Sequence, residues 1–96
     1  MEDIGMKRFL IEVPHGESKK ECQKAIRIFM ETGSHFLSKA DWGCADGEHK
    51  AWIIVEVPGK AEARNILPSL YRSDAKIIEL NTFAEDVGDP GRFHKK

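Results

Sequence analysis

The sequence has little of several features that would assign a function directly. It contains only two cysteines, Cys22 and Cys44, too few for the disulfide framework of a small secreted domain. Its 15 lysines and arginines nearly balance 16 aspartates and glutamates, so it lacks the positive charge that attracts nucleic acids. It has no apolar run approaching the about 20 residues of a membrane helix, and residues 1–5 lack the apolar segment of a signal peptide. We therefore expect a cytoplasmic protein with reduced thiols and with no nucleic-acid or membrane partner.

The sequence does contain enough apolar residues for one small folded domain. Its 96 residues are 41% hydrophobic and 32% charged, a composition typical of a single globular unit. Met6 offers an alternative start, and the C-terminal segment has few residues that could be buried. We expect an N-terminal extension at residues 1–6, a folded domain at residues 7–83 and a flexible tail at residues 84–96.

The spacing of the apolar residues predicts four strands and two helices. Alternating apolar and polar residues predict strands at residues 7–13, 34–42, 50–57 and 75–83. Apolar residues three or four apart predict helices at residues 18–32 and 60–67, with an extra turn at residues 68–72. The order β-α-β-β-α-β is that of the ferredoxin-like α+β fold. It predicts an antiparallel sheet with the strand order 4-1-3-2 and both helices on one face.

The same alternation assigns the strand residues to two faces of the sheet. A hairpin turn at Asp46-Gly47 would pair Trp42 with Ala51 and Cys44 with His49. The strand residues predicted to face the helices are Phe9, Ile11, Val13, Phe36, Ala40, Trp42, Ala51, Ile53, Val55, Val57, Ile78 and Leu80. The helix residues predicted to meet them are Cys22, Ala25, Ile26, Phe29, Met30, Ala63, Ile66, Leu67 and Leu70.

The other face of the predicted sheet mixes apolar with charged side chains. Its apolar members, Leu10, Leu37, Trp52, Ile54 and Ile77, form too large a patch to remain in water. Its charged members are too many for a dry core. A second copy packed sheet to sheet about a two-fold axis is the simplest cover, so we expect a homodimer with a polar cavity in each subunit.

This open face supplies the first candidate site. Carboxylates and a histidine beside an apolar wall can hold a small molecule or move protons. The residues in question are His35, Asp41, Trp52, Glu56 and Glu79. We predict a small-molecule-binding domain, and the alternative is a cofactor-free isomerase or monooxygenase-like enzyme. The competing interpretation is that Arg8–Glu56 and Glu12–Lys50 are ordinary cross-strand ion pairs and that His35 faces water.

The hairpin supplies a second candidate site, for a metal ion. Cys44, Asp46 and His49 offer a thiolate, a carboxylate and an imidazole, a ligand set suited to zinc or nickel. The spacing matches no standard metal motif, and no fourth ligand is evident. The competing interpretation is a hairpin with an incidental thiol and no cofactor.

Several runs of the sequence also resemble a known type of protein. They are Gly33-Ser34-His35-Phe36-Leu37, Ala40-Asp41-Trp42-Gly43-Cys44, Asp46-Gly47-Glu48-His49-Lys50-Ala51-Trp52 and Tyr71-Arg72-Ser73-Asp74-Ala75-Lys76-Ile77-Ile78-Glu79-Leu80-Asn81. Over residues 6–84 the chain resembles small uncharacterised bacterial proteins of the dimeric α+β barrel type. That architecture is similar to cofactor-free monooxygenases of antibiotic biosynthesis, muconolactone isomerases and stress-responsive barrel proteins. The resemblance implies a homodimer with a pocket between sheet and helices, but no catalytic motif of those enzymes matches this chain, and a fold does not fix chemistry.

Overall fold

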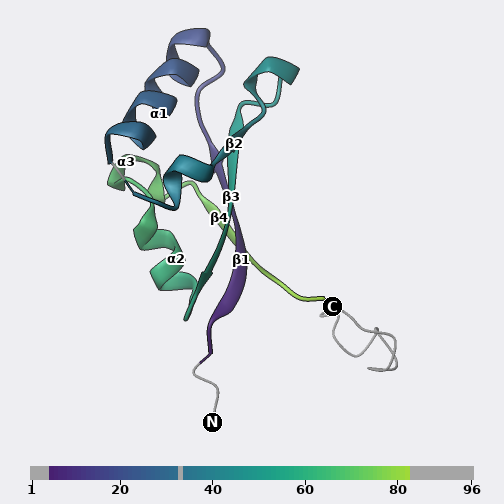
Figure 1. Cartoon of the computed structure of the whole chain (residues 1–96). Coiled ribbons are helices and arrows are strands. Elements are labelled where there is room, and N and C mark those ends of the chain that lie inside the picture. The colour runs from purple at the N-terminus through teal and green to yellow at the C-terminus, as the bar shows by residue number, and fades with distance from the viewer. Residues whose placement is uncertain (1–4, 33, 83–96) are drawn as a thin grey trace.

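The computed structural model describes residues 5–32 and 34–82 as one sheet with helices on one side (Figure 1). Its elements are β1 (Lys7–Pro14), α1 (Lys19–Thr32), the 3-10 helix η1 (Leu37–Lys39), β2 (Asp41–Trp42), the 3-10 helix η2 (Cys44–Asp46), β3 (Lys50–Val57), α2 (Lys60–Ile66), α3 (Ser69–Arg72) and β4 (Lys76–Leu80). Among these residues, no helix has both the length and the apolar character needed to cross a membrane. The predicted tail at residues 84–96 and most of the predicted extension at residues 1–6 lie outside the described residues.

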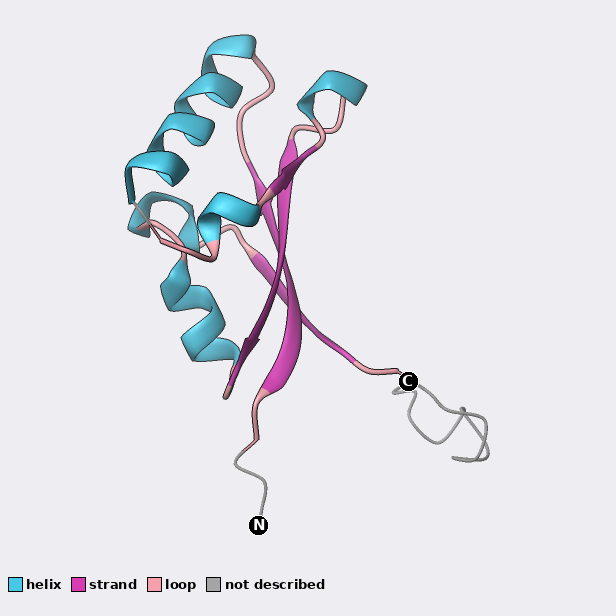
Figure 2. Cartoon of the chain, in the orientation of Figure 1, coloured by secondary structure: helices cyan, strands magenta, loops and turns pink. Residues whose placement is uncertain are grey.

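The sheet has the predicted topology. Its four strands run antiparallel to their neighbours in the order β2-β3-β1-β4, which is 4-1-3-2 counted from the other edge. The helices α1, α2 and α3 lie on one face of this sheet and leave the other face bare, and η2 lies at the tip of the β2–β3 hairpin (Figure 2). The structure therefore confirms a small α+β domain with the β-α-β-β-α-β order.

The two central strands and α1 form most of the core as predicted. Phe9, Ile11 and Val13 of β1 and the alternate residues of β3 are buried beneath the helices. The helix buries a narrower stripe than expected, with Cys22, Ala25 and Phe29 inside. Ile26 is 37% exposed and Met30 64% exposed, so the prediction that both are buried is wrong. Each directly follows a buried residue in the sequence, and successive residues of a helix point about 100° apart, so both side chains turn from the core toward solvent.

The segment before the hairpin is not the long strand that was predicted at residues 34–42. Only Asp41–Trp42 pairs with β3, and the residues before it form a turn and η1. The amide of Phe36 donates to Ser34 Oγ at 3.1 Å, and Ser38 Oγ donates to the His35 carbonyl at 2.8 Å. Local bonds from serine side chains compete with a sheet ladder and here replace it.

This change of structure exchanges the positions of two neighbouring side chains. Leu37 is 2% exposed in the core, whereas Phe36 is 36% exposed. The strand alternation predicted the reverse. Because a 3-10 turn does not alternate faces every second residue, the period of a strand misassigned both side chains.

The last strand also faces the opposite way from the prediction. Ile77 pairs with Ile11 and is buried, while Ile78 pairs with Leu10 on the bare face. Leu80 lies on the bare face with Ile78, and Glu79 takes the helix side with its side chain exposed. A one-residue difference in phase moves every side chain of a strand to the other face.

The second helical segment buries Tyr71 where Leu70 was expected. Ala63 and Leu67 are buried as predicted, but Leu70 is 57% exposed. Leu67, which precedes Pro68, has extended backbone and ends α2, so the turn α3 does not continue the helical phase of α2. Tyr71 therefore packs edge to face against Phe29, with ring centroids 5.7 Å apart.

The two cysteines form a disulfide, Cys22–Cys44, which joins α1 to η2. The prediction that both thiols are reduced is wrong for this structure. It rested on the small number of cysteines, which does not show whether two of them meet in the fold. The cytoplasmic location stays a prediction.

Candidate functional site

Three side chains with metal-ligating atoms meet at one end of the sheet. They are His15, directly after β1, Cys44, in η2, and His49, directly before β3. One ligand atom from each lies within 4.8 Å of the other two, and among the residues that the structure describes this is the one group of three or more such side chains. We call these three residues the His-Cys-His cluster. All three are partly buried, so the cluster differs from acidic groups that lie fully in water.

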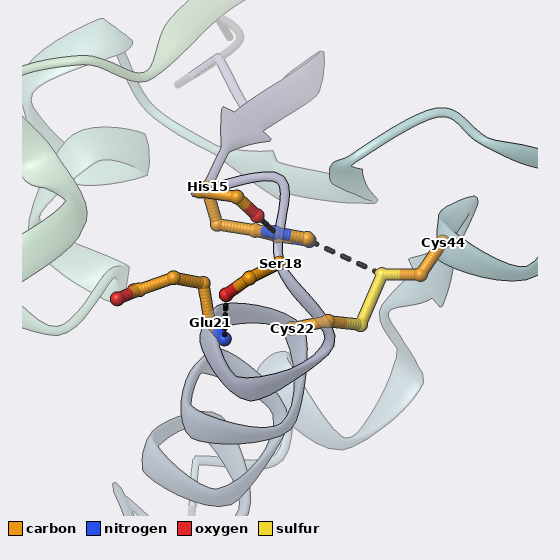
Figure 3. Close-up of a disulfide and its surroundings, with 6 residues drawn as sticks. His15, Ser18, Glu21, Cys22 and Cys44 are labelled. Carbon is orange, nitrogen blue, oxygen red and sulfur yellow. Dashed lines mark hydrogen bonds between the residues drawn. A yellow bond between two sulfur atoms is a disulfide. The ribbon is translucent and has the colours of Figure 1, made fainter.

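His15 is held with one ring nitrogen directed at the sulfur of Cys44. Its amide donates to the carbonyl of His49 at 3.1 Å, which extends the pairing of β1 and β3 beyond Pro14. Its Nδ1 lies 3.1 Å from the carbonyl oxygen of Gly16, and its Nε2 lies 3.3 Å from Cys44 Sγ (Figure 3). A carbonyl oxygen only accepts hydrogen bonds, so the proton of a neutral His15 belongs on Nδ1. The lone pair on Nε2 then faces the sulfur, as in a metal-ligating histidine oriented by a backbone carbonyl.

Cys44 is positioned by a tightly bonded hairpin. Gly43 donates to the carbonyl of Lys50 at 3.1 Å and accepts from the amides of Asp46 and Glu48 at 3.0 and 2.9 Å. A Cβ at position 43 would lie 2.8 Å from the Trp52 ring and from the Glu48 carbonyl oxygen. Gly47 closes the turn in the left-handed region, with φ of 85°. The hairpin therefore favours glycine at positions 43 and 47, the two turns of backbone that enclose Cys44.

His49 contributes a ring nitrogen that has no hydrogen-bond partner. Its Nδ1 is buried and makes no hydrogen bond to any residue in the described part of the chain. A buried polar atom in this state costs about 1–3 kcal/mol relative to one that is bonded. Its ring meets that of His15 edge to face, with centroids 6.1 Å apart. A cation bound between the rings would give such a nitrogen its missing partner.

Cys22 approaches the cluster from the first turn of α1. Its amide donates to the carbonyl of Ser18 at 3.1 Å, and the amide of Glu21 donates to Ser18 Oγ at 3.1 Å. The second bond caps the N-terminus of this helix. A hollow of about 360 Å³ opens beside the disulfide. Its lining consists of Lys19, Cys22, Gln23, Cys44, Ala45 and His49.

The distances within the cluster suit a tetrahedral metal site. With zinc–sulfur and zinc–nitrogen bonds near their usual lengths, a sulfur and an imidazole nitrogen lie about 3.6 Å apart on one ion. The 3.3 Å between His15 Nε2 and Cys44 Sγ is close to that value, and the other pairs of ligand atoms lie within 4.8 Å. A disulfide sulfur carries no negative charge, so the full ligand set requires Cys44 as a free thiolate.

The predicted hairpin metal site is brought together only in part. The structure places Cys44 and His49 in one cluster, although they are not partners in the β2–β3 ladder. Asp46 is exposed and does not belong to the cluster. The residue that the sequence argument missed is His15. Its signal is the strand register, because extending the β1–β3 pairing by one step beyond Pro14 sets His15 opposite His49.

The predicted open-face site is spread over a wider area than expected. Asp41 and Trp52 are direct partners in the β2–β3 ladder. Glu56 lies on the same face of β3, four residues or about 13 Å along the strand from Trp52. His35 is exposed in the turn before η1, and Glu79 points to the helix side, so the structure does not bring these two to the open face.

Ordinary polar contacts surround Glu12 and Trp52 on the open face. Trp52 Nε1 donates to Glu12 Oε1 at 3.3 Å, and Lys50 Nζ lies 3.6 Å from Glu12 Oε2. The Glu12–Lys50 ion pair was the competing interpretation of these charges, and the structure confirms it. Arg8 and Glu56 are direct partners in the β1–β3 register.

A second hollow, of about 340 Å³, has His15 in its lining. Tyr71 and Glu21 are among the residues that line it. Burial raises the pKa of the Tyr71 phenol above its usual 10.0, and the nearby negative charge of Glu21 raises it further. Tyr71 is therefore a neutral hydrogen-bonding group at physiological pH and has no features of an activated base.

The fold and the cluster define a small α+β domain with a histidine–cysteine site at one end of its sheet. Comparisons with models of protein families, with curated proteins and with solved structures found no match to this chain.

Proposed function

We propose that the reduced chain binds a divalent transition-metal ion of the zinc class through the His-Cys-His cluster. The observation that carries the proposal is the convergence of three ligand atoms, from His15, Cys44 and His49, within 4.8 Å of one another. Two imidazoles and a thiolate are ligands that zinc and neighbouring ions of the first transition row prefer. Three ligands from the chain leave a fourth position for water or for a ligand donated by another molecule.

Two further observations favour a metal ion over an incidental cluster. His15 has its Nδ1 against a backbone carbonyl, which leaves Nε2 as the ligating atom. His49 has a buried ring nitrogen without a hydrogen-bond partner in the described residues. Both conditions are met when imidazoles bind a cation, and neither is needed for a hairpin that only closes a sheet.

The experiment is a zinc competition titration of the reduced chain against a chromophoric chelator. A phosphine serves as the reductant, because dithiol reductants themselves bind zinc. We expect one ion per chain for the wild type and a loss of at least tenfold in affinity for Cys44→Ser and His15→Gln. The matched control is Asp46→Asn, which alters a neighbour of Cys44 that lies outside the cluster and so keeps wild-type affinity.

The outcomes separate the two possible ligand sets. Loss of affinity in Asp46→Asn, with His15→Gln unaffected, would return the site to the hairpin set of Cys44, Asp46 and His49. No binding by the reduced wild type would end the proposal.

The bare face of the sheet supports a second candidate function, the small-molecule cavity of a homodimer. The strand register sets Ile54, Leu10 and Ile78 in one apolar row across β3, β1 and β4. Ile54 is 56% exposed and Ile78 is 37% exposed. A row of large apolar side chains across three strands is a surface that sheets bury against another layer.

Charges on either side of the apolar row favour a second copy as that layer. Arg8 lies one step from Leu10 along the face and Glu12 one step the other way, because alternate residues of a strand share a face. A two-fold axis along the row therefore sets Glu12 opposite the partner's Arg8, with the apolar rows in contact. Asp41 and Trp52, at the sheet edge, would then line the predicted ligand cavity.

Analytical ultracentrifugation tests this assembly. We expect a dimer for the wild type and a monomer for Ile54→Lys, which places a charge in the apolar row. The control is Leu70→Lys, because Leu70 is as exposed as Ile54 but lies in α3, on the helix side. A monomeric wild type, or loss of the dimer in the control alone, would remove the dimer and its cavity. The cofactor-free enzyme alternative stays a prediction, with His35 placed away from the open face.

A further inference from the structure

We propose that Cys22 makes the metal site responsive to redox conditions, with a free Cys44 thiolate holding the ion and the Cys22–Cys44 disulfide expelling it. This inference rests on the proposed metal-binding function. Cys22 is then the resolving thiol of a switch and is not required for holding the ion. The state of one bond, between Cys22 and Cys44, decides whether the cluster has three ligands or two.

The structure shows that one sulfur serves both states. Cys44 Sγ lies 3.3 Å from His15 Nε2 while it is bonded to Cys22 (Figure 3). Cys22 is not a member of the group of ligand atoms that lie within 4.8 Å of one another. In the disulfide, the Cys44 sulfur has no charge and only the two imidazoles remain as ligands. Metal binding and disulfide formation therefore compete for the same atom.

The two cysteines come from separately anchored elements, so the bond can break without unfolding either one. Cys22 belongs to the first turn of the fourteen-residue helix α1, which Ser18 caps. Cys44 belongs to a hairpin that Gly43 and Gly47 shape through their own backbone bonds. Their Cα atoms are 6.8 Å apart and 22 residues apart in sequence. Loss of the bond leaves both sulfurs near each other and allows it to form again.

The hollow beside the disulfide gives small thiols a way in. Cys22, Cys44 and His49 line it, and so does the ammonium-bearing Lys19. A positive charge beside a disulfide favours the approach of an anionic thiolate. The same hollow gives a metal ion access to Cys44 and His49, so reductant and ion reach the site by one route.

The exchange balances with a dithiol as the reductant. One thiolate of the dithiol attacks a sulfur of the Cys22–Cys44 bond and forms a mixed disulfide, and its second thiolate then closes a disulfide within the reductant. The cysteines gain two electrons and two protons, and the reductant loses the same. The Cys44 thiol releases its proton to solvent as the sulfur binds the ion. In the reverse direction a low-molecular-weight disulfide accepts the two electrons, and the ion leaves as the Cys22–Cys44 bond closes.

Linkage makes this relation reciprocal. If the disulfide weakens metal binding, then bound metal must make the disulfide harder to form by the same factor. Where disulfides form in a reducing compartment, they are usually transient and serve catalysis or redox sensing. Coupling to a metal ion produces this behaviour. The switch therefore senses both metal supply and the thiol–disulfide balance.

The test compares three samples by zinc competition titration: oxidised wild type, wild type reduced with a phosphine, and Cys22→Ser, which has one free thiol at Cys44. Thiol quantification confirms the state of each sample beforehand. We expect the reduced wild type and Cys22→Ser to bind one zinc ion with affinities within tenfold of each other. We expect the oxidised wild type to bind at least a hundredfold more weakly.

Each other outcome is decisive. Equal zinc affinity in the oxidised and reduced wild type would overturn the switch and keep the metal site. Binding by the reduced wild type but not by Cys22→Ser would make Cys22 a required ligand and overturn its role as the resolving thiol. No binding by either reduced sample would overturn the proposed metal-binding function itself.

Discussion

The disulfide between α1 and the hairpin makes a definite contribution to stability, which Cys22→Ser removes. The bond closes a loop between positions 22 residues apart. The loss of chain entropy that such a loop imposes on the unfolded state corresponds to about 3 kcal/mol at 25 °C. A small domain has a total stability of about 5–15 kcal/mol, so the variant should lose a readily measured part of it.

Urea unfolding, followed by tryptophan fluorescence, measures this loss. Oxidised wild type should be more stable than Cys22→Ser by about 3 kcal/mol. Wild type reduced with a phosphine is the matched control, because it lacks the same cross-link and keeps the native side chain. Reduced wild type and Cys22→Ser should therefore show similar free energies of unfolding.

Zinc extends the same measurement to the proposed site. An ion that binds only the folded chain adds about 2.7 kcal/mol at a free concentration one hundred times its Kd. Zinc should therefore restore most of the stability lost on reduction, and it should have little effect on the oxidised chain. Equal stability of oxidised wild type and Cys22→Ser would refute the cross-link argument. A larger effect of zinc on the oxidised chain would refute the competition between ion and disulfide.

Three further predictions concern the core, Tyr71 and the hairpin. Leu37→Ala should lower the free energy of unfolding by about 2–5 kcal/mol, because Leu37 is buried in the core. Phe36→Ala, at the exposed neighbouring position, should have a much smaller effect. Equal losses of stability in urea unfolding would contradict the observed burial of these two side chains. The absorbance of the single tyrosine should titrate above pH 10, mainly because Tyr71 is buried, and Glu21→Gln should lower the midpoint only in part. Because folding raises the pKa of Tyr71, the neutral phenol adds stability to the folded state below pH 10, and this stability is lost as the pH rises through the raised pKa. A titration midpoint at 10 would contradict the raised pKa. Gly43→Ala should disturb the hairpin and weaken zinc binding by the reduced chain, because a Cβ at position 43 would clash with Trp52. Unchanged zinc affinity would show that this tight turn does not position Cys44 for the ion.

The fold could be predicted from the sequence wherever burial follows a regular period. The alternation in β1 and β3 correctly assigned Phe9, Ile11, Ala51 and Ile53 to the core, and the order of elements fixed the topology. The prediction failed where local hydrogen bonds override alternation. The serines beside Phe36 and Leu37 support a turn and a 3-10 helix, which reverse the burial of these two side chains.

The phase of β4 could not be predicted from its sequence. The run Ile77-Ile78 offers an apolar side chain to either face, so alternation does not choose between them. The register with β1 decides, because Ile77 lies opposite Ile11. The register between β4 and β1 depends on where α3 ends and on where the chain then re-enters the sheet. Both are set by the packing of the whole fold and not by the sequence of β4.

The candidate site was only partly visible because its parts lie far apart in the sequence. The hairpin drew attention to Cys44 and His49 through their proximity in the chain. His15 and Cys22 join them only once β1, β3 and α1 are assembled. The position of Asp46 between the two predicted it as a ligand, but the 3-10 turn at Cys44–Asp46 leaves it exposed.

Native mass spectrometry of the reduced chain with zinc tests the central claim most directly. It resolves the number of ions bound to each subunit and the number of subunits in one spectrum. At a zinc concentration that just fills the reduced wild type, we expect one ion per chain for that sample and much lower occupancy for Cys44→Ser and for the oxidised wild type. A reduced wild type that retains no zinc, or a Cys44→Ser variant that retains as much, would contradict the assignment of the His-Cys-His cluster as a metal site.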